Sequence, residues 1–229
     1  MCKLAKKTII AIDGGAGVGK TMVSKDLSKK LGILYIDTGA MYRAVGLYFI
    51  KNNIVINDEN IEKYIKDIDV TLKVNNNGDN LVFLNGEDVT NKIRNEEVSM
   101  AASDVSKNSI VRETLVKKQR ELAGKESVVI EGRDTTTVIF PNADIKLFFT
   151  ASVDMRAKRR HNDLIKKDSN VDLEKLKENM IKRDIQDSTR SVSPLRKTED
   201  AIEVDTTNNT VEDTTNVVLG ILKERIGLI

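Results

Sequence analysis

The segment from Gly14 to Thr21, GGAGVGKT, carries residue types that can bind phosphate. It follows a short apolar run, Ile9 to Ile12, and precedes a segment whose apolar residues recur at helical spacing until Gly32, which is placed to stop the helix. Its four glycines are expected to adopt backbone conformations that a Cβ forbids, at Gly14, Gly15, Gly17 and Gly19. Successive N–H groups can then turn inward at a helix N-terminus and bind phosphate oxygens. Lys20 can then reach the β- and γ-phosphates, and the Thr21 hydroxyl can be a ligand of Mg²⁺. The pattern predicts a nucleoside-triphosphate site formed by Gly14, Gly15, Ala16, Gly17, Val18, Gly19, Lys20 and Thr21.

Arginine is the scarcer of the two basic residues. The 37 basic residues comprise 25 lysines and 12 arginines, so the chain uses lysine for most of its positive charge. A guanidinium group can bind a phosphate or a base edge through two parallel hydrogen bonds, which an ammonium group cannot do. We therefore expect arginines where a ligand needs that geometry, with chance scattering as the alternative.

A second apolar run, Ile33 to Ile36, leads through Asp37 into a helical pattern. Thr38 stands where a helix N-cap is expected, and Arg43 falls within the first two turns. The carboxyl ends of strands in an open α/β sheet border the ligand crevice, so both residues are candidates for ligand binding. The alternative is that Thr38 only caps the helix and that Arg43 is solvated.

Length and composition exclude several classes of protein. With 229 residues the chain can form one α/β domain with insertions. Its 37 basic and 35 acidic residues nearly cancel, which argues against a dedicated binder of nucleic acid or anionic membranes. The single cysteine, Cys2, cannot form an internal disulfide, and no stretch approaches the roughly 20 apolar residues of a membrane span. We expect a cytoplasmic protein that contacts neither nucleic acid nor membrane.

Strand-like and helical segments alternate along the chain, which predicts a parallel sheet flanked by helices. Five strands are expected, near residues 8, 33, 127, 145 and 201. Within residues 61–98 the pattern changes: 68–74 alternate, a turn follows, and 81–84 return as a second strand. This predicts a small antiparallel unit inserted into the α/β fold. The segment from Ser99 to Leu122 is expected to form one long helix, or two helices if Ser109 interrupts it.

Further charged segments lie in the second half of the chain. The sequence EGRD at 131–134 comes directly after an apolar strand at 127–130. Residues 155–167 hold six basic residues against one acidic residue, a pattern that is also typical of a solvated helix face. A helix from about Asp172 ends before Pro194 and carries Arg183, Asp187 and Arg190.

Several separated motifs occur in a fixed order over nearly the whole chain. They are GGAGVGKT at 14–21, YIDTGAMYRA at 35–44, LNGEDVT at 84–90, IRNEEVSMAAS at 93–103, EGRDTTTVIFPNA at 131–143, ASVDMRAKRR at 151–160 and KRDIQDSTRSVSPL at 182–195. Through this ordered set the chain resembles the bacterial cytidylate kinases, which belong to the nucleoside monophosphate kinase group of P-loop proteins. A phosphate loop alone would be shared with many other families.

The resemblance implies a fold, a reaction and a division of the chain. Residues 1–229 would form one P-loop kinase domain with a five-stranded parallel core. Residues 61–98 would be an inserted unit that binds the acceptor nucleotide, and residues 153–168 a short arginine-rich lid over ATP. The reaction would transfer the γ-phosphoryl group of ATP to CMP or dCMP with Mg²⁺, giving ADP and CDP or dCDP, in pyrimidine nucleotide metabolism. A monomer is expected.

The resemblance also implies a role for individual residues, and eight of the 12 arginines have one. The acceptor phosphate would be held by Thr38, Arg43 and Arg133, and Arg190 would join this cluster. Cytosine would be read by Ser103, Arg112 and Asp134, and the sugar would contact Arg183 and Asp187. The lid would supply Arg156, Arg159 and Arg160, of which Arg159 would contact ATP. The catalytic set would be Lys20, Arg133, Arg156, Arg160 and Arg190, and Mg²⁺ would be bound by Thr21 and Glu131.

The chemistry of phosphoryl transfer fits these residue types. The reaction needs positioning and neutralisation of charge, so a chain with one histidine and one cysteine requires no covalent nucleophile. The Asp134 carboxylate can accept a hydrogen bond from the N4 amine of cytosine, whereas uracil presents a repelling acceptor at that position. The alternative for Asp134 is an ion pair with Arg133 or another neighbour.

The chain departs from the usual family pattern at three positions. The family usually has proline at the position of Gly15, aspartate at that of Glu131 and glycine near Thr136, and without the proline the loop is expected to be more flexible. Two other functions stay open. One is a P-loop kinase for another small acceptor such as UMP. The other is a nucleotide-dependent regulator that binds RNA or the ribosome through residues 156–167, against which the near-zero net charge argues.

Overall fold

A five-stranded sheet lies at the centre of the computed structural model, which describes residues 4–75, 79–124, 126–165 and 172–228. The strand order is β2-β6-β1-β7-β8, and every neighbouring pair runs parallel. The arrangement confirms the α/β fold class and the five parallel strands expected from the sequence. The strands are β1 (Ile9–Gly14), β2 (Leu34–Asp37), β6 (Val128–Gly132), β7 (Ile145–Thr150) and β8 (Ile202–Asp205).

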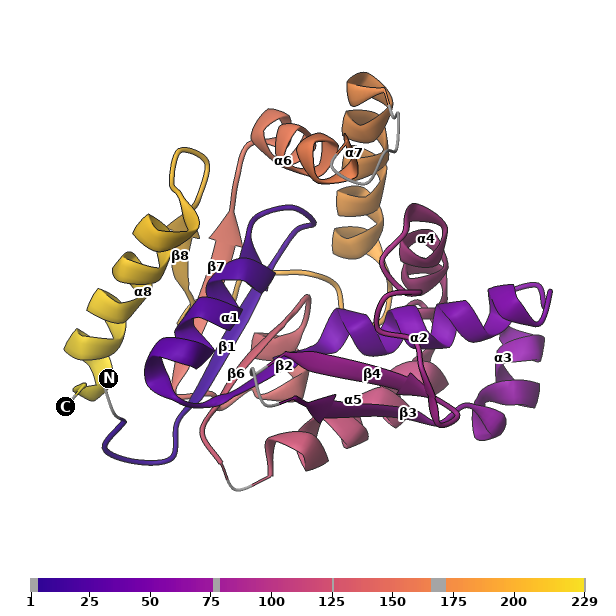
Figure 1. The fold of residues 1–229 in the computed structure, drawn as a ribbon, viewed down its shortest axis with the longest axis horizontal. Helices are drawn as coiled ribbons and strands as arrows, with labels where there is room; N and C mark the ends of the chain where they lie inside the picture. Colours follow the sequence, from indigo (N-terminus) through magenta and orange to yellow (C-terminus); the bar gives the residue numbers. More distant parts are fainter. Residues whose placement is uncertain (1–3, 76–78, 125, 166–171, 229) are drawn as a thin grey trace.

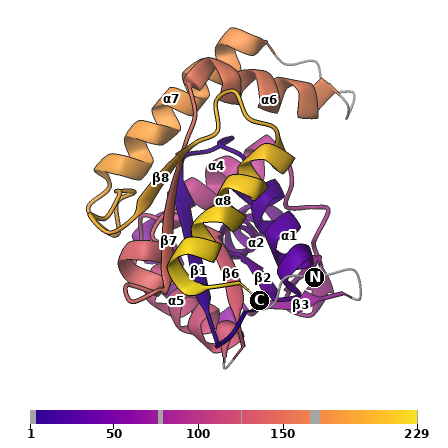
Figure 2. The same ribbon diagram turned by 90° about the vertical axis from the view of Figure 1, so that its left-hand side faces the viewer.

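Helices cover both faces of the sheet (Figures 1 and 2). One face packs against α1 (Lys20–Leu31) and α8 (Val211–Ile226), and the other against α2 (Thr38–Lys51) and α5 (Ser109–Ala123). The central strand β1 contributes to both cores, with Ile10 and Ile12 on the α1 side and Ala11 on the α2 side. Burial on both faces explains why this strand reads as a continuous apolar run.

The turn from β1 into α1 leaves the start of the helix open. Gly19 precedes the helix with a φ of 91°, and no side chain caps the helix N-terminus. The free backbone N–H groups of this first turn are therefore available to a ligand. At the other end Gly32 adopts a left-handed conformation, with a φ of 65°, and its N–H donates to the carbonyl of Ser28. The stop signal expected at Gly32 is confirmed.

The cap of α2 differs from the expected one. Asp37, rather than Thr38, is the N-cap, because β2 continues through residue 37 and the Asp37 carboxylate accepts from the backbone N–H of Ala40 at 2.9 Å. Thr38 is the first helical residue, and its hydroxyl donates to the carbonyl of Glu131 at 2.8 Å. The prediction of a Thr38 cap is wrong, and this side chain instead joins the start of α2 to the end of β6.

The insertion at 61–98 contains an antiparallel sheet of β3 (Val70–Val74), β4 (Asn80–Leu84) and β5 (Glu87–Asp88), and α3 (Asp58–Tyr64) overlaps its start. The expected hairpin is present, and β5 adds a short third strand that the sequence pattern did not indicate. Apolar residues of β3 and β4 share one core with α2. The small sheet therefore supports the helix that follows Asp37.

The segment from Ser99 to Leu122 forms parts of two helices, α4 (Glu96–Val105) and α5, so the alternative of a break is correct. The break occurs because the Asn108 side chain accepts from the N–H groups of Ile110 and Val111 and thereby starts a new helix. Upstream, α4 approaches α2 closely at Gly46, where a Cβ atom would lie 2.9 Å from the backbone nitrogen of Ala102.

Two helices, α6 (Val153–Ile165) and α7 (Leu173–Thr189), pack side by side beyond the carboxyl ends of the strands (Figure 1). The segment expected as a lid, 153–168, coincides with α6 up to residue 165, and residues 166–168 lie outside the described residues. No helix within the described ranges has the length and apolar character needed to cross a membrane.

Candidate active site

A cleft of about 940 Å³ lies at the carboxyl end of the sheet. It is bordered by the turn before α1, the start of α2, the residues after β6, and helices α4, α6 and α7. Among the residues expected at a site, those that line it are Ala16, Gly17, Val18, Gly19, Lys20, Thr21, Thr38, Arg43, Ser103, Arg112, Glu131, Arg133, Asp134, Arg159, Arg160, Arg183, Asp187 and Arg190. Gly14, Gly15 and Arg156 do not line it.

The glycines of the phosphate loop do not share one role. Gly14, Gly17 and Gly19 have positive φ values of 152°, 76° and 91°. Gly15 is absent from the positive-φ positions, so the expectation that it needs a conformation forbidden to other residues is wrong. What Gly15 provides is space, since a Cβ there would lie 3.1 Å from Oδ1 of Asp184.

Lys20 is folded back into the loop. Its Nζ donates to the carbonyls of Gly14 and Gly15, each at 2.7 Å, and the residue is only 6% exposed. Burial, followed by the nearby charge of Arg133, lowers the pKa of Lys20 to about 7, although Glu131 acts in the opposite direction. The loop therefore holds an ammonium group that lacks a full counter-charge and would gain from an arriving phosphate.

Glu131, near the end of β6, combines with Thr21 to form a set of oxygen donors. Thr21 and Tyr35 hydrogen-bond to the buried Glu131 carboxylate, the Tyr35 hydroxyl at 2.5 Å. Burial and then the charge of Asp37 raise the pKa of Glu131, while Lys20 opposes this shift. No cluster of three or more histidine, cysteine or acidic residues suited to a metal occurs within the described ranges. One hydroxyl and one carboxylate fit Mg²⁺, which keeps several waters and binds substrate phosphates.

Asp13, near the end of β1, connects that strand to the segment after β6. This fully buried carboxylate accepts four hydrogen bonds, from the backbone N–H and the hydroxyl of Thr135, both at 2.8 Å, and from those of Thr136, at 2.8 and 2.6 Å. Burial raises the pKa of Asp13, and the four hydrogen bonds oppose that shift. We refer to Asp13, Thr135 and Thr136 as the Asp13 clasp.

At the start of α2, two arginines approach one acid. Asp37 accepts from Nη2 of Arg43 at 2.8 Å, and Nη2 of Arg94 lies 3.9 Å from the same carboxylate oxygen. Burial would raise the pKa of Asp37, but the charges of Arg43 and Arg94 outweigh it and hold the pKa below its usual value. Arg94 lines the cleft and was missed by the sequence reasoning, although it stands within the motif IRNEEVSMAAS.

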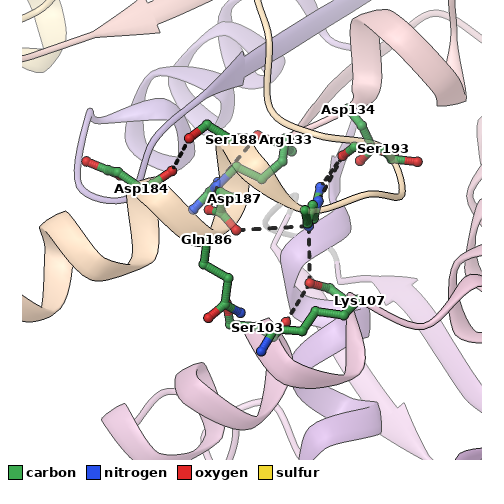
Figure 3. Close-up of polar contacts among 12 residues, drawn as sticks. Ser103, Lys107, Arg133, Asp134, Asp184, Gln186, Asp187, Ser188 and Ser193 are labelled. Carbon is green, nitrogen blue, oxygen red and sulfur yellow. Dashed lines mark hydrogen bonds and ion pairs between the residues drawn. The ribbon is translucent and has the colours of Figure 1, made fainter. Parts of the chain in front are cut away.

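A second group gathers around Asp187 of α7 (Figure 3). Nε of Arg133 donates to Asp187 at 2.8 Å, and Nη1 of Arg190 lies 3.9 Å from the other carboxylate oxygen. Arg183 also faces this group, where burial and then the charge of Arg133 lower its pKa to about 10. Three guanidinium groups thus share one carboxylate, which leaves a net positive charge on this side of the cleft.

The residues expected to read a base also meet in the structure. Arg112 forms a buried ion pair with Asp134, and its Nη1 donates to the carbonyl of Ser106 at 3.1 Å. The ion pair with a neighbour, which was the alternative for Asp134, is therefore present, and the neighbour is Arg112. Ser103 lies close by and accepts from Nε2 of Gln186 at 2.7 Å (Figure 3).

The three arginines of α6 point in different directions. Arg156 binds behind the phosphate loop, where it donates to the carbonyl of Ala16 at 3.2 Å and to Asp184 at 2.6 Å. Arg159 donates to the backbone carbonyl of Thr206 at 2.6 Å. Arg160 pairs with Glu96 of α4 at 3.0 Å and so connects α6 to the opposite wall of the cleft.

An uncapped helix start with a buried lysine, facing a cluster of arginines across one cleft, defines a P-loop kinase. The sequence model of the family described as cytidylate kinase matches residues 10–224. A cytidylate kinase of Caldicellulosiruptor saccharolyticus is 48% identical over 97% of this chain and 98% of its own length. Another, from Caldicellulosiruptor bescii, is 51% identical over 93% of this chain and 95% of its own length. The chain belongs to the cytidylate kinase family, which confirms the resemblance inferred from its motifs.

A comparison of structures supports the fold alone. The crystal structure of an uncharacterized protein from Eubacterium ventriosum aligns with a TM-score of 0.52 and 18% sequence identity. The alignment covers 96% of this chain and 100% of the other. The arrangement of the sheet and its helices therefore recurs in a protein of distant sequence.

Proposed function

We propose that this protein transfers the γ-phosphoryl group of ATP to CMP or dCMP, producing ADP and CDP or dCDP. The observation that carries the proposal is the single cleft that joins the phosphate loop to the arginine cluster. In-line transfer requires that two nucleotides meet with their phosphates facing one another. The cleft has main-chain donors and Lys20 on one side, and arginines from several elements on the other.

ATP binds at the phosphate loop in this proposal. The free N–H groups at the start of α1 and the Lys20 ammonium receive the β- and γ-phosphates, and Arg159 contacts the nucleotide from α6. Thr21 and Glu131 would hold Mg²⁺, which would supply charge neutralisation for the phosphates. Lys20 exchanges its hydrogen bonds with Gly14 and Gly15 for bonds to phosphate oxygens.

The acceptor nucleotide binds on the opposite side. Thr38, Arg43 and Arg133 hold its phosphate, and Arg190 adds positive charge nearby. Arg183 and Asp187 contact the sugar, while Ser103, Arg112 and Asp134 contact cytosine. The insertion at 61–98 contributes through its end, where Arg94 and Glu96 line the cleft. The antiparallel sheet itself supports α2 from outside the cleft.

The lid arginines complete the charge pattern. Arg156 and Arg160 approach the transferred group when α6 closes over the bound nucleotides, which also excludes water from the phosphoryl group. Both side chains must first leave Asp184 and Glu96, their present partners. The internal contacts of Arg156, Arg159 and Arg160 also argue against an RNA-binding face formed by the basic run.

The test is a titration of the purified protein with Mg-ATP and each of CMP, dCMP, UMP and AMP, following ADP formation and identifying the diphosphate product. Strong stimulation by CMP and dCMP, with weak stimulation by UMP and AMP, is expected. Equal stimulation by all four would remove the cytosine specificity, and preference for another acceptor would identify a different kinase. Binding of RNA that weakens steeply with added salt, without any effect of CMP on ATP turnover, would favour the alternative function, a nucleotide-dependent regulator that binds RNA or the ribosome. The monomeric state and the cytoplasmic location stay predictions.

A further inference from the structure

Among the polar groups at the cleft without a partner within the described residues, one is a neutral hydroxyl. The hydroxyl of Tyr42, on the second turn of α2, is buried and forms no hydrogen bond with any described residue. The residue is only 7% exposed, yet it lines the cleft. A buried hydroxyl without a partner costs stability, so its presence at a ligand cleft requires an explanation.

The packing of α2 fixes where Tyr42 lies. Tyr42 is one helical turn before Gly46, and residues four apart share a helix face. At Gly46 the backbones of α2 and α4 come so close that a Cβ atom would lie 2.9 Å from the nitrogen of Ala102. Tyr42 therefore lies beside the turn of α4 that carries Ser103, another cleft residue.

The ring of Tyr42 has a clear partner even though its hydroxyl does not. The Arg112 guanidinium stacks on this ring, with its central carbon 5.3 Å from the ring centroid. The edge of the same guanidinium is occupied by Asp134 and by the carbonyl of Ser106. The ring contact and the pairing along the edge hold Arg112 in place, and the Tyr42 hydroxyl takes part in none of these hydrogen bonds.

The hydroxyl is available as a neutral donor and acceptor. Burial raises the pKa of Tyr42 above its usual value; the charge of Arg112 opposes this, and that of Asp134 adds to it. The group therefore keeps its proton at any pH where the protein would work. A neutral hydroxyl suits a ligand group without charge, whereas the phosphates have Lys20 and Arg43 available.

We propose that the Tyr42 hydroxyl forms a hydrogen bond with the nucleobase of the acceptor nucleotide. This assignment rests on the proposed function, in which the neighbouring Arg112 and Asp134 read the same base. The base supplies the partner that the free protein lacks, so the cost of the unpaired hydroxyl is removed on binding. Tyr42 is then a specificity residue with two parts: its ring orients Arg112, and its oxygen contacts the ligand.

The test is Tyr42→Phe, which removes the oxygen and keeps the ring that stacks on Arg112. Binding of CMP, dCMP and ATP is measured by calorimetry, together with thermal unfolding of the free protein. Tyr48→Phe, on the same helix but away from the cleft, is the matched control. We expect the Kd of CMP and of dCMP to rise by about 2- to 10-fold in Tyr42→Phe, the range of one net hydrogen bond. ATP affinity should be unchanged, and the free variant should unfold at the same or a higher temperature.

Three outcomes would overturn the assignment, and they differ in what else they affect. Unchanged CMP and dCMP affinity in Tyr42→Phe would refute the contact while leaving the kinase proposal in place. A loss confined to CMP would indicate a contact with the 2′-hydroxyl of ribose, so the base contact would be wrong. Failure of the wild-type protein to bind CMP would refute the proposed function and this assignment together.

Discussion

The donor and acceptor sides of the cleft are built in different ways. The donor side is formed by consecutive residues, 14–21, and its main polar groups are main-chain N–H groups and Lys20. The acceptor side takes side chains from α2, α4, α5, α7 and the residues after β6. Nε atoms of Arg43, Arg112 and Arg183 are buried there without a partner among the described residues. On the donor side the groups left for a ligand are thus main-chain N–H groups and one lysine held by its own loop, whereas on the acceptor side they are N–H groups of separate side chains.

This difference indicates which amino-acid substitutions each side tolerates. Main-chain donors do not depend on side-chain identity, so the donor side depends on conformation and on one lysine. The acceptor side depends on the identity and the relative position of side chains that are far apart in sequence. The following variants test that contrast, from the largest expected effect to the smallest.

Lys20→Met should have the largest effect. It removes the only side-chain cation of the phosphate loop, and loss of a preorganised donor to transferring phosphates costs about 10²- to 10³-fold in kcat. Steady-state turnover with CMP measures this effect, and thermal unfolding shows that the variant is folded. Lys29→Met, at an exposed position of the same helix, is the control. Unchanged turnover in Lys20→Met would remove Lys20 from the mechanism.

Asp134→Asn should change selectivity on the acceptor side. The amide can offer an N–H to the O4 atom of uracil, so the preference in kcat/KM for CMP over UMP should fall by about 10- to 100-fold. The variant also leaves Arg112 without its counter-charge, which lowers the free energy of unfolding. The selectivity in kcat/KM and the free energy of unfolding must therefore both be measured. A loss of stability with unchanged selectivity would make Asp134 a purely structural residue.

The low pKa of Lys20 predicts proton uptake on ATP binding. At pH 8 a group with a pKa of about 7 is mostly neutral in the free protein. The negative charge of the triphosphate favours the ammonium form and raises the pKa, so binding should take up a proton. Uptake should decline toward pH 6, where Lys20 is already charged. Calorimetry in buffers of different ionisation enthalpy measures it, and Lys20→Arg is the control because arginine stays protonated. Equal proton uptake by the wild-type protein and by Lys20→Arg at pH 8 would contradict the lowered pKa of Lys20.

Gly15→Ala should have the smallest effect. A Cβ at Gly15 would meet the ends of Asp184 and Arg156, at 3.1 and 3.2 Å, and both side chains can move slightly. The free energy of unfolding should change by less than about 0.5 kcal/mol. Gly17→Ala is the comparison, since its φ of 76° imposes a cost of about 1–2 kcal/mol on a residue with a Cβ. Urea denaturation measures the free energy of unfolding of both variants, and a similar loss in the two would show that the conformation at Gly15 also requires glycine.

The donor side could be predicted from the residues themselves because its chemistry follows the chain. A strand, a glycine-rich turn and a helix start are consecutive, and local conformation decides what they bind. The fold class was predictable for a similar reason, since short apolar runs indicate strands and the segments between them have apolar residues at helical spacing. One error was local: Asp37 replaces Thr38 as the cap. The cap at Asn108 decides in favour of two helices where the sequence left one or two open.

Thr38 and Arg43 were candidates from their place after a strand, but the rest of the acceptor side could be predicted only through the family resemblance. No spacing in the sequence indicates that Arg112 meets Asp134, or that Arg133 meets Asp187, because those pairs depend on how α5 and α7 pack. Asp13 offered a signal that was not used, an acid inside an apolar strand, where an unpaired charge is rarely buried. Tyr42 offered little signal, since an aromatic residue on an apolar helix face usually belongs to the core.

The Asp13 clasp has a consequence for how the two substrates are aligned. It fastens the strand that leads into the phosphate loop to the segment that follows Arg133 and Asp134. Asp13 thereby fixes the position of the phosphate loop relative to the segment after β6, although it is not assigned a contact with either nucleotide. The clasp therefore fixes the phosphate loop relative to Arg133 and Asp134, and opening of α6 for nucleotide exchange would leave that alignment unchanged.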